Sequence, residues 1–191
     1  MASHLVVDNY DSFTYNLVHI LEDILQEDVD VCRVDGVNFD SLKSYDSVVL
    51  SPGPGLPNES KNLLPLVERL LELEKKILGV CLGMQALAMA TGMELKNLND
   101  VHHGVSHELI NPDFTTQLYR EIKSPLMVGR YHSWVVDESS MKNDWLITAK
   151  DTDGEIMSME NTKYKFFAIQ YHPESVLTPQ GRKILENYIA A

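Results

Sequence analysis

Cys81 lies in the segment whose residue types and spacing point most directly to chemistry. Residues 77–85 read Ile-Leu-Gly-Val-Cys-Leu-Gly-Met-Gln, an apolar strand pattern that runs into a helical one. This is the Gly-x-nucleophile-x-Gly spacing of a nucleophile elbow, in which Gly79 and Gly83 remove side chains that would collide in the tight turn. The N-terminus of the following helix favours a reactive thiolate. A free cysteine is equally often a small buried apolar residue, so this segment alone leaves both interpretations open.

A base and an orienting acid follow another predicted strand. The apolar run at residues 166–171 ends in His172 and Glu174, with Pro173 between them. Side chains at i and i+2 of an extended segment point to the same side, and the proline holds His172 out of the helical region. The carboxylate would fix the imidazole tautomer while the other ring nitrogen faces a nucleophile.

The other histidines are weaker candidates. His132 has no carboxylate two residues further on, so it ranks below His172 as the base. No Cys or carboxylate set completes the tetrahedral ligand spacing of a metal site near the cluster at 102–107, and we expect no metal. The histidines expected to be structural are His4, His19, His102, His103 and His107.

A rigid turn of prolines and glycines occupies residues 52–57, after a predicted strand. Its glycines allow a ligand to approach the backbone closely, but it lacks the Lys and Ser/Thr of a phosphate-binding loop. If this turn lies beside the elbow, the N–H groups of Gly53 and Leu82 can form an oxyanion hole. One such donor typically lowers a barrier by about 3 kcal/mol.

Alternating elements in the first half of the chain must position these groups. Short β-branched runs predict strands at 5–8, 29–34, 47–51 and 77–81. Helical spacing predicts helices at about 13–26 and 59–74, and a third from just after Cys81 to near Gly92. This order is typical of an α/β fold: an open, mainly parallel twisted sheet flanked by helices on both faces, as in flavodoxin-like proteins.

The pattern changes beyond Gly92. Short alternating segments at 118–120, 145–149, 155–159 and 166–171 predict a small antiparallel extension and a final sheet strand. Thr178 as N-cap and Pro179 at the first helical position predict a last helix. The inner face of that helix would consist of Ile184, Leu185, Tyr188 and Ile189. There is no internal repeat or linker, so residues 1–191 are expected to form a single domain.

Composition excludes several classes of partner. The 16 Lys and Arg against 28 Asp and Glu give a formal charge of -12, which would repel a phosphate backbone, so no nucleic acid is expected. No apolar run approaches the roughly 20 residues of a membrane span, and residues 1–4 lack the character of a secretory signal. We therefore expect a cytoplasmic protein without membrane association, in which Cys32 and Cys81 are free thiols.

These motifs together resemble those of class I, triad-type glutamine amidotransferases along essentially the whole chain. The signatures at 51–55, 79–85 and 171–174 occur in the order typical of that family. The resemblance implies Cys81 as nucleophile, His172 as base and acid, and Glu174 as its orienter, with no cofactor in this chain. It also implies these contacts to glutamine: the backbone of Gly53, Pro54 and Gly55, the side chain of Gln85, and the main chain around Ser133 and Trp134.

Within the family, residues 8–16 resemble the opening of the small (component II) subunits of anthranilate synthase and aminodeoxychorismate synthase. From the residues alone, this segment predicts only a strand end followed by Asp11 or Ser12 capping a helix. The resemblance implies a subunit that hydrolyses L-glutamine through a cysteinyl thioester. Its ammonia would pass to a chorismate-aminating synthase subunit (component I), for tryptophan synthesis, for folate synthesis, or for both.

Two departures from the family pattern bear on the partner. Met84 replaces a frequent His, which should matter little because the residue is neither acid, base nor ligand in this scheme. Residues 103–106 resemble the family's His-Gly-Lys-Thr-Ser loop with its lysine absent, which leaves the contact to a synthase, and hence the pathway, open.

Two other functions fit part of the pattern. A γ-glutamyl hydrolase or other cysteine hydrolase on the same fold would act without a partner, and activity on γ-glutamyl peptides would reveal it. A flavodoxin-like binding module fits the strand pattern as well. It predicts a phosphate loop after the first strand, yet residues 9–13 contain no glycine and carry an aspartate.

Overall fold

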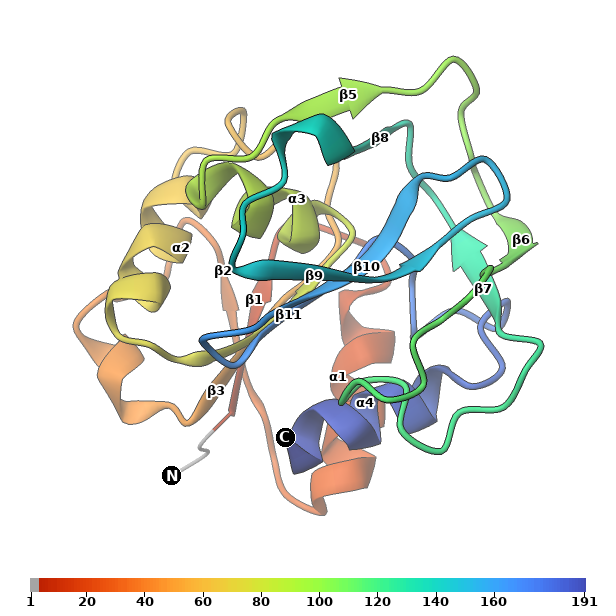
Figure 1. The fold of residues 1–191 in the computed structure, drawn as a ribbon. Coiled ribbons are helices and arrows are strands. Elements are labelled where there is room, and N and C mark those ends of the chain that lie inside the picture. Colours follow the sequence, from red (N-terminus) through yellow and green to blue (C-terminus); the bar gives the residue numbers. More distant parts are fainter. Residues whose placement is uncertain (1–3) are drawn as a thin grey trace.

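A seven-stranded sheet forms the centre of the computed structural model, which describes residues 4–191 (Figure 1). Its strand order is β2-β1-β3-β4-β11-β10-β9. The strands from β2 to β11 are parallel, and β10 and β9 continue the sheet in antiparallel fashion. The predicted α/β fold with a mainly parallel sheet and an antiparallel extension is confirmed. Residues 1–3, part of the segment in which no secretory signal is expected, lie outside the described range.

The predicted elements of the first half are all present, with small shifts at their ends. The largest shift is in α2, which begins at Leu63 rather than near residue 59. The helices are α1 Thr14–Leu25, α2 Leu63–Glu72, α3 Leu82–Ala90 and α4 Gly181–Ala190, with 3-10 turns η1 Ser41–Ser44 and η2 Glu138–Ser140. The strands are β1 His4–Asp8, β2 Asp30–Arg33, β3 Ser47–Leu50, β4 Lys76–Val80, β5 Leu95–Asn97, β6 Val105–Glu108, β7 Met127–Arg130, β8 Trp134–Val136, β9 Trp145–Lys150, β10 Ile156–Asn161 and β11 Phe166–Ile169.

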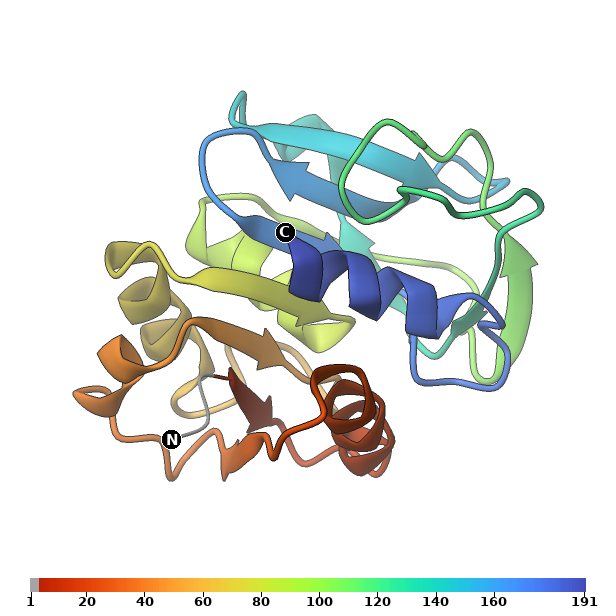
Figure 2. The same cartoon turned by 90° about the horizontal axis from the view of Figure 1, so that it is seen from below.

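Helices cover the parallel sheet on both faces: α1 and α4 lie together on one face, and α2 and α3 lie on the other (Figures 1 and 2). Successive side chains of a strand point to opposite faces, so Val6 packs in the core beneath α1 and α4 while Leu5 and Val7 pack beneath α2 and α3. Burial on both faces explains why these strands read as continuous apolar runs. Within residues 4–191, no helix has both the length and the apolar character needed to cross a membrane.

The predicted strand at 118–120 is wrong. These residues form turns, in which Leu118 and Tyr119 are buried while the following residue is exposed. The Leu118 N–H donates to the carboxylate of Glu160, and the Tyr119 hydroxyl donates to Ser158 Oγ at 2.6 Å. The apolar residues of this segment are therefore buried because they anchor a turn to β10, and not because they belong to a strand. The sequence also failed to predict the two small antiparallel sheets, β5 with β8 and β6 with β7.

The predicted start of the last helix is also wrong. The helix α4 begins at Gly181 with Gln180 as its N-cap residue. Thr178 does not cap it because the threonine hydroxyl donates to the His172 carbonyl at 2.6 Å and accepts from the Gly129 N–H at 2.9 Å. The predicted inner face holds, since Ile184, Leu185 and Tyr188 are fully buried and Ile189 packs against the same core.

At the start of α1, the N-cap position is occupied by Phe13, so neither Asp11 nor Ser12 caps the helix as predicted. The Asp11 carboxylate instead accepts a hydrogen bond from the Phe13 N–H at 2.7 Å, ahead of the first helical residue. This aspartate therefore organises the approach to the helix and not its first turn.

Close packing between β4 and α3 depends on two glycines. A Cβ atom on Gly79 would lie 2.5 Å from the carbonyl oxygen of Gly83, and one on Gly83 would lie 2.5 Å from the carbonyl oxygen of Leu50. Both neighbours are backbone atoms that cannot rotate away. The two glycines thus let the first turn of α3 press against the sheet, as the spacing around Cys81 predicts.

Gly79→Ala is expected to destabilise the protein by about 2 kcal/mol, because the added methyl group overpacks a contact between two backbone segments. Gly36→Ala is the matched control, since its added Cβ would meet no atom closer than 3.5 Å. Urea denaturation followed by circular dichroism measures both. Equal free energies of unfolding for the two variants would contradict this account of the packing.

Candidate active site

Three chain segments meet at the carboxyl edge of the sheet, where ligand sites of open α/β folds lie. They follow the neighbouring strands β3, β4 and β11. Together with segments around 101–103 and 131–134 they enclose a cavity of about 190 Å³. Its lining residues are Gly53, Pro54, Gly55, Cys81, Leu82, Gln85, Val101, His102, His103, Tyr131, His132, Ser133 and Trp134. Cys81, the two expected oxyanion-hole residues and all the expected glutamine contacts are among them, whereas His172 and Glu174 are not.

Cys81 occupies the turn between β4 and α3 in a strained conformation. Its φ is 52° and its ψ is -103°, a region that residues with side chains rarely adopt. The Cys81 N–H donates to the Ile169 carbonyl at 2.8 Å, which extends the pairing of β4 with β11 by one bond. The side chain is 5% exposed and yet lines the cavity. This geometry matches the predicted elbow: the sulfur is held at the surface of the cavity.

His172 and Glu174 form the predicted pair. The imidazole Nδ1 and the Glu174 Oε1 are 2.6 Å apart, and both side chains are buried. The backbone that presents them differs from the expectation, because β11 ends at Ile169 and residues 172–175 form a turn closed by the Ser175 N–H and the His172 carbonyl. The pair forms across this turn, and not along an extended strand.

Interactions within the triad keep His172 protonated. Burial alone would lower its pKa, but the interactions with the Cys81 thiol and the Glu174 carboxylate outweigh burial and raise the pKa of His172 to about 10. Its Nε2 atom is buried and makes no hydrogen bond to any of residues 4–191. The arrangement therefore combines a nucleophilic sulfur, an imidazolium that can give up a proton, and a carboxylate that orients the ring.

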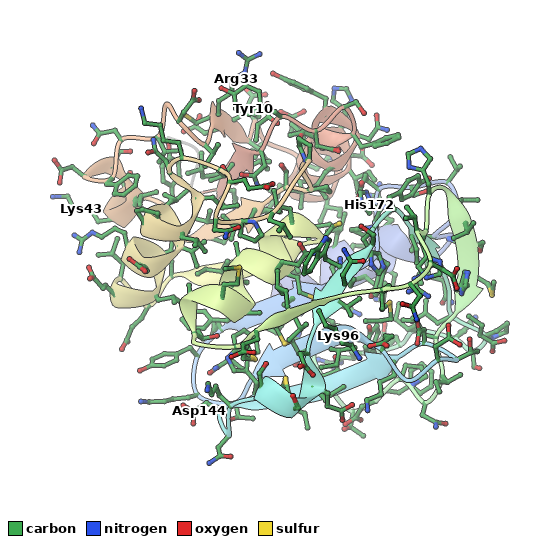
Figure 3. All side chains as sticks on the ribbon, turned by 90° about the horizontal axis from the view of Figure 1, so that it is seen from above. Tyr10, Arg33, Lys43, Lys96, Asp144 and His172 are labelled. Atoms are coloured by element: carbon green, nitrogen blue, oxygen red, sulfur yellow. The ribbon has the colours of Figure 1, made fainter. Side chains whose placement is uncertain are left out.

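Two aromatic rings pack around His172, and one of them, Tyr131, also lines the cavity. The centroid of the Tyr131 ring is 4.7 Å from that of the imidazole, and Phe13 approaches both rings. The Tyr131 hydroxyl is 3.1 Å from Ser175 Oγ. Figure 3 shows His172 within the outline of the molecule and the exposed Lys43 at its far edge, and His172 is buried. The catalytic candidate is thus shielded from bulk water.

The loop after β3 is fixed by Asn9. Its backbone N–H donates to Ser51 Oγ at 2.9 Å, and its side-chain amide donates to the Ser51 carbonyl at 2.8 Å. A Cβ atom on Gly53 would lie 2.6 Å from the Asn9 carbonyl oxygen and 2.7 Å from the Leu82 Cδ2 atom. Gly53 and Leu82 are therefore immediate neighbours, as an oxyanion hole built from both requires.

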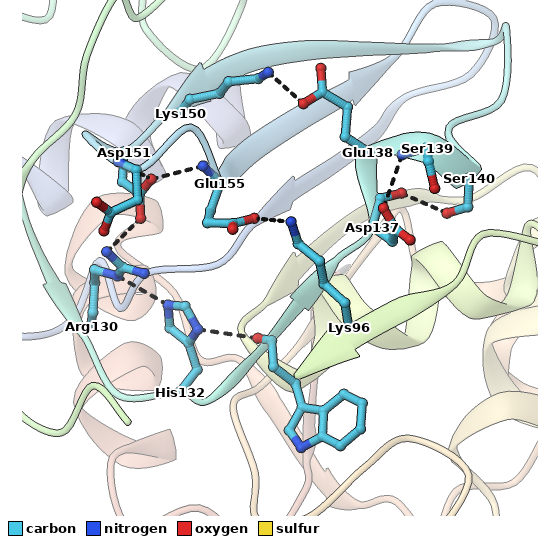
Figure 4. Close-up of polar contacts among 12 residues, drawn as sticks. Lys96, Arg130, His132, Asp137, Glu138, Ser139, Ser140, Lys150, Asp151 and Glu155 are labelled. Atoms are coloured by element: carbon cyan, nitrogen blue, oxygen red, sulfur yellow. Dashed lines mark hydrogen bonds and ion pairs between the residues drawn. The ribbon is translucent and has the colours of Figure 1, made fainter. Parts of the chain in front are cut away.

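A buried ion pair supports the opposite wall (Figure 4). Arg130 and Asp151 are both fully buried, with Nη1 and Oδ2 2.6 Å apart. The Arg130 Nε donates to His132 Nε2 at 3.2 Å, and the other nitrogen of this imidazole is 3.1 Å from the Trp134 carbonyl. Burial and the charge of Arg130 lower the pKa of His132 to about 3. His132 is therefore a neutral wall residue and not a competing base.

The histidines at 102–107 were expected to be structural, but two of them lie at the cavity. His102 and His103 line the cavity, and the His102 ring is 5.1 Å from that of His107. Burial and the charge of Arg130 lower the pKa of His102. Within residues 4–191, no group of three or more His, Cys, Asp or Glu side chains is arranged to hold a metal ion.

Two cavity residues and one buried neighbour of Cys81 were not predicted from the sequence. Val101 and Tyr131 belong to segments without a recognisable pattern. Gln170 was missed although it lies two residues before His172, and its amide donates to the Cys81 sulfur at 3.5 Å. Both cysteines, Cys32 and Cys81, are free thiols as predicted.

Comparisons with known proteins agree with this geometry. The family model for class-I glutamine amidotransferases matches residues 5–191, and the chain therefore belongs to that family and is a glutamine amidotransferase. It is 37% identical to anthranilate synthase component 2 of Lactococcus lactis, over 97% of this chain and 92% of that protein. It is 34% identical to the aminodeoxychorismate/anthranilate synthase component 2 of Bacillus subtilis, over 97% and 94%.

Two further matches come from Thermotoga maritima. The bifunctional protein TrpGD is 36% identical over 97% of this chain, which spans only 31% of that longer protein. A crystal structure of a glutamine amidotransferase aligns with a TM-score of 0.79 at 16% identity, covering 97% of this chain and 94% of its own. At that identity the second match supports the fold alone.

Arg130→Met is expected to destabilise the protein by about 3–5 kcal/mol, because it leaves the carboxylate of Asp151 buried without a partner. Lys96→Met is the control, since the pair of Lys96 with Glu155 is partly exposed, with side chains 41% and 18% accessible, and should contribute less, about 1 kcal/mol. Chemical denaturation measures both variants. A loss of similar size at the two sites would show that the buried pair does not support the cavity wall.

Proposed function

We propose that this chain is the glutamine-hydrolysing subunit of a chorismate-aminating synthase, most simply anthranilate synthase. The observation that carries the proposal is a cavity lined by Cys81 on its strained turn, together with the buried pair of His172 and Glu174, whose imidazole interacts with Cys81. The names of relatives similar along nearly the whole chain support the choice of pathway.

The first half of the proposed reaction forms a thioester. The Cys81 thiolate attacks the amide carbon of glutamine, and the N–H groups of Gly53 and Leu82 stabilise the oxyanion. The protonated His172 then transfers its proton to the leaving nitrogen, which departs as ammonia. The raised pKa of His172, to about 10, suits this role as the acid of the first step.

The second half regenerates the thiolate. His172, now neutral, takes a proton from water, and the resulting hydroxide attacks the γ-glutamyl thioester. The sulfur leaves as a thiolate, glutamate is released, and the imidazolium forms again beside Glu174. No cofactor takes part in this scheme.

We propose that glutamine is held by the backbone of residues 53–55, the side chain of Gln85, and the main chain at Ser133 and Trp134. All of these line the cavity. At about 190 Å³ the cavity is smaller than the roughly 300 Å³ or more typical of drug-sized ligand pockets, which favours a single amino acid over a γ-glutamyl peptide.

A subunit shared between two pathways is the second candidate. The Bacillus subtilis relative is named for both aminodeoxychorismate and anthranilate synthase, and its similarity to this chain nearly equals that of the relative named for anthranilate synthase alone. Identifying the product formed with each synthase subunit of the same organism distinguishes the two proposals. A cytoplasmic location fits either one and stays a prediction.

Cys81→Ser and His172→Ala are each expected to reduce glutamine-dependent product formation at least about 100-fold, because each removes a group that takes part in bond making or proton transfer. Product formation from added ammonia should be unchanged, since the partner subunit carries out that step. The assay uses the complex with the synthase subunit and follows anthranilate by fluorescence. Cys32→Ser, which alters a thiol outside the cavity, is the control. Full glutamine use by either triad variant would refute the mechanism.

We propose that the synthase subunit docks over the mouth of the cavity. Val176, two residues beyond Glu174, is 94% exposed, and Val101 in the cavity wall is 74% exposed. Phe13 adds a partly exposed ring beside Tyr131. Val176 follows Ser175, whose hydroxyl is 3.1 Å from that of the cavity residue Tyr131. Exposed apolar side chains near a site are typical of a protein interface, and a partner here would cover the exit through which ammonia leaves.

Val176→Asp is expected to weaken association with the synthase subunit at least about tenfold, because it places an unpaired charge within an apolar contact. Leu146→Asp, on the edge strand β9 away from the cavity, is the control with comparable chemistry. Isothermal titration calorimetry with the purified synthase subunit gives both affinities. If Val176→Asp and Leu146→Asp bind as tightly as the unmodified chain, the partner docks elsewhere.

A further inference from the structure

We infer that Gln170 is a further catalytic residue, whose side-chain N–H stabilises the Cys81 thiolate from the side of the sheet. The inference rests on the proposed role of Cys81 as nucleophile. It assigns a function to a buried polar side chain that the reaction scheme above leaves unused.

The contact between the Gln170 amide and the Cys81 sulfur is a buried hydrogen bond. The Nε2 atom of Gln170 lies 3.5 Å from the Cys81 sulfur, within hydrogen-bonding distance for that element. Gln170 is fully buried, and Cys81 is 5% exposed. A buried donor interacts more strongly with a charged acceptor than with a neutral one, so this contact favours the thiolate over the thiol.

A second glutamine fixes which end of the Gln170 amide faces the sulfur. Gln85 donates through its Nε2 to the Trp134 carbonyl at 2.9 Å, and a carbonyl oxygen can only accept. The same Nε2 also donates to the Oε1 of Gln170 at 3.3 Å. With its oxygen committed to Gln85, Gln170 must present its NH₂ group to Cys81.

The backbone holds the two partners in register. Cys81 donates its N–H to the Ile169 carbonyl, and Gln170 donates its own N–H to the Met157 carbonyl, both at 2.8 Å. Gln170 is therefore anchored between β4 and β10 immediately beside the turn of Cys81. The side chain needs no rearrangement to reach the sulfur.

The contact also connects substrate binding with the nucleophile. Gln85 lines the cavity where glutamine is proposed to bind, and its amide orients Gln170, which in turn touches the sulfur. A substrate that holds Gln85 in place thereby keeps the donor directed at Cys81. This chain of contacts assigns Gln85 a positioning role in addition to its proposed contact with glutamine.

The test uses Gln170→Met, which keeps the length and removes the donor, in a Cys32→Ser background so that Cys81 is the only thiol. The rate of alkylation by iodoacetamide is measured against pH on the full chain. Glutamine hydrolysis by the complex with the synthase subunit gives kcat and KM. We expect the midpoint of the alkylation profile to rise by about one pH unit and kcat to fall about tenfold, with KM changed less than about twofold. Gln117→Met is the matched control, because that amide donates to a carbonyl remote from the cavity.

An unchanged alkylation midpoint in Gln170→Met would overturn the inference, even if kcat fell, because a merely structural loss does not alter the charge state of the thiol. Gln170→Glu is the second variant if Gln170→Met folds poorly. The negative charge of the glutamate beside the sulfur should raise the alkylation midpoint further. An unchanged midpoint in Gln170→Glu would likewise overturn the inference. If the Cys32→Ser parent is alkylated no faster than its Cys81→Ser derivative, the proposed role of Cys81 as nucleophile is refuted, independently of Gln170. The two failures are therefore distinguishable.

Discussion

The strained backbone of Cys81 is the constraint on which the site depends. A residue at φ 52° and ψ -103° costs about 1–3 kcal/mol and persists only where its surroundings impose it. Here Gly79 and Gly83 allow α3 to press on the sheet, and the bond from Cys81 to Ile169 fixes the end of β4. Relaxing this turn would move the sulfur away from the cavity. The close packing of α3 on the sheet thus offsets the backbone strain of Cys81.

The strand order brings the turn of Cys81 next to the other segments of the site. Because β3, β4 and β11 are adjacent and parallel, the loop carrying Gly53, the turn of Cys81 and the turn of His172 emerge side by side. The opposite wall comes from a different part of the chain, between β5 and β8. Its short strands β7 and β8 contribute Val128, Val135 and Val136 to the core, and the buried pair of Arg130 with Asp151 supplies a further fixed point.

The parallel sheet and the triad could be predicted from the sequence because both depend on local pattern: apolar runs, glycines at fixed spacing, and an acid two residues from a histidine. The cavity wall could not, because it depends on contacts between segments distant in sequence. Thr178 illustrates the limit. Its type and the following proline predict a helix cap, but its hydroxyl bonds the backbone at His172 and Gly129. Gln170 illustrates the opposite case: it directly follows β11, and a polar residue within the apolar run at 166–171 was a signal that the sequence did offer.

Two buried histidines on either side of the cavity show how placement decides chemistry. Both lose solvation, which lowers the pKa of an imidazole. For His132 the nearest charge is the cation of Arg130, and the pKa falls to about 3. For His172 the neighbours are a thiol and a carboxylate, and the pKa rises to about 10. Of these two histidines, therefore, only His172 carries a proton at neutral pH, which is the form that the proposed role as an acid requires.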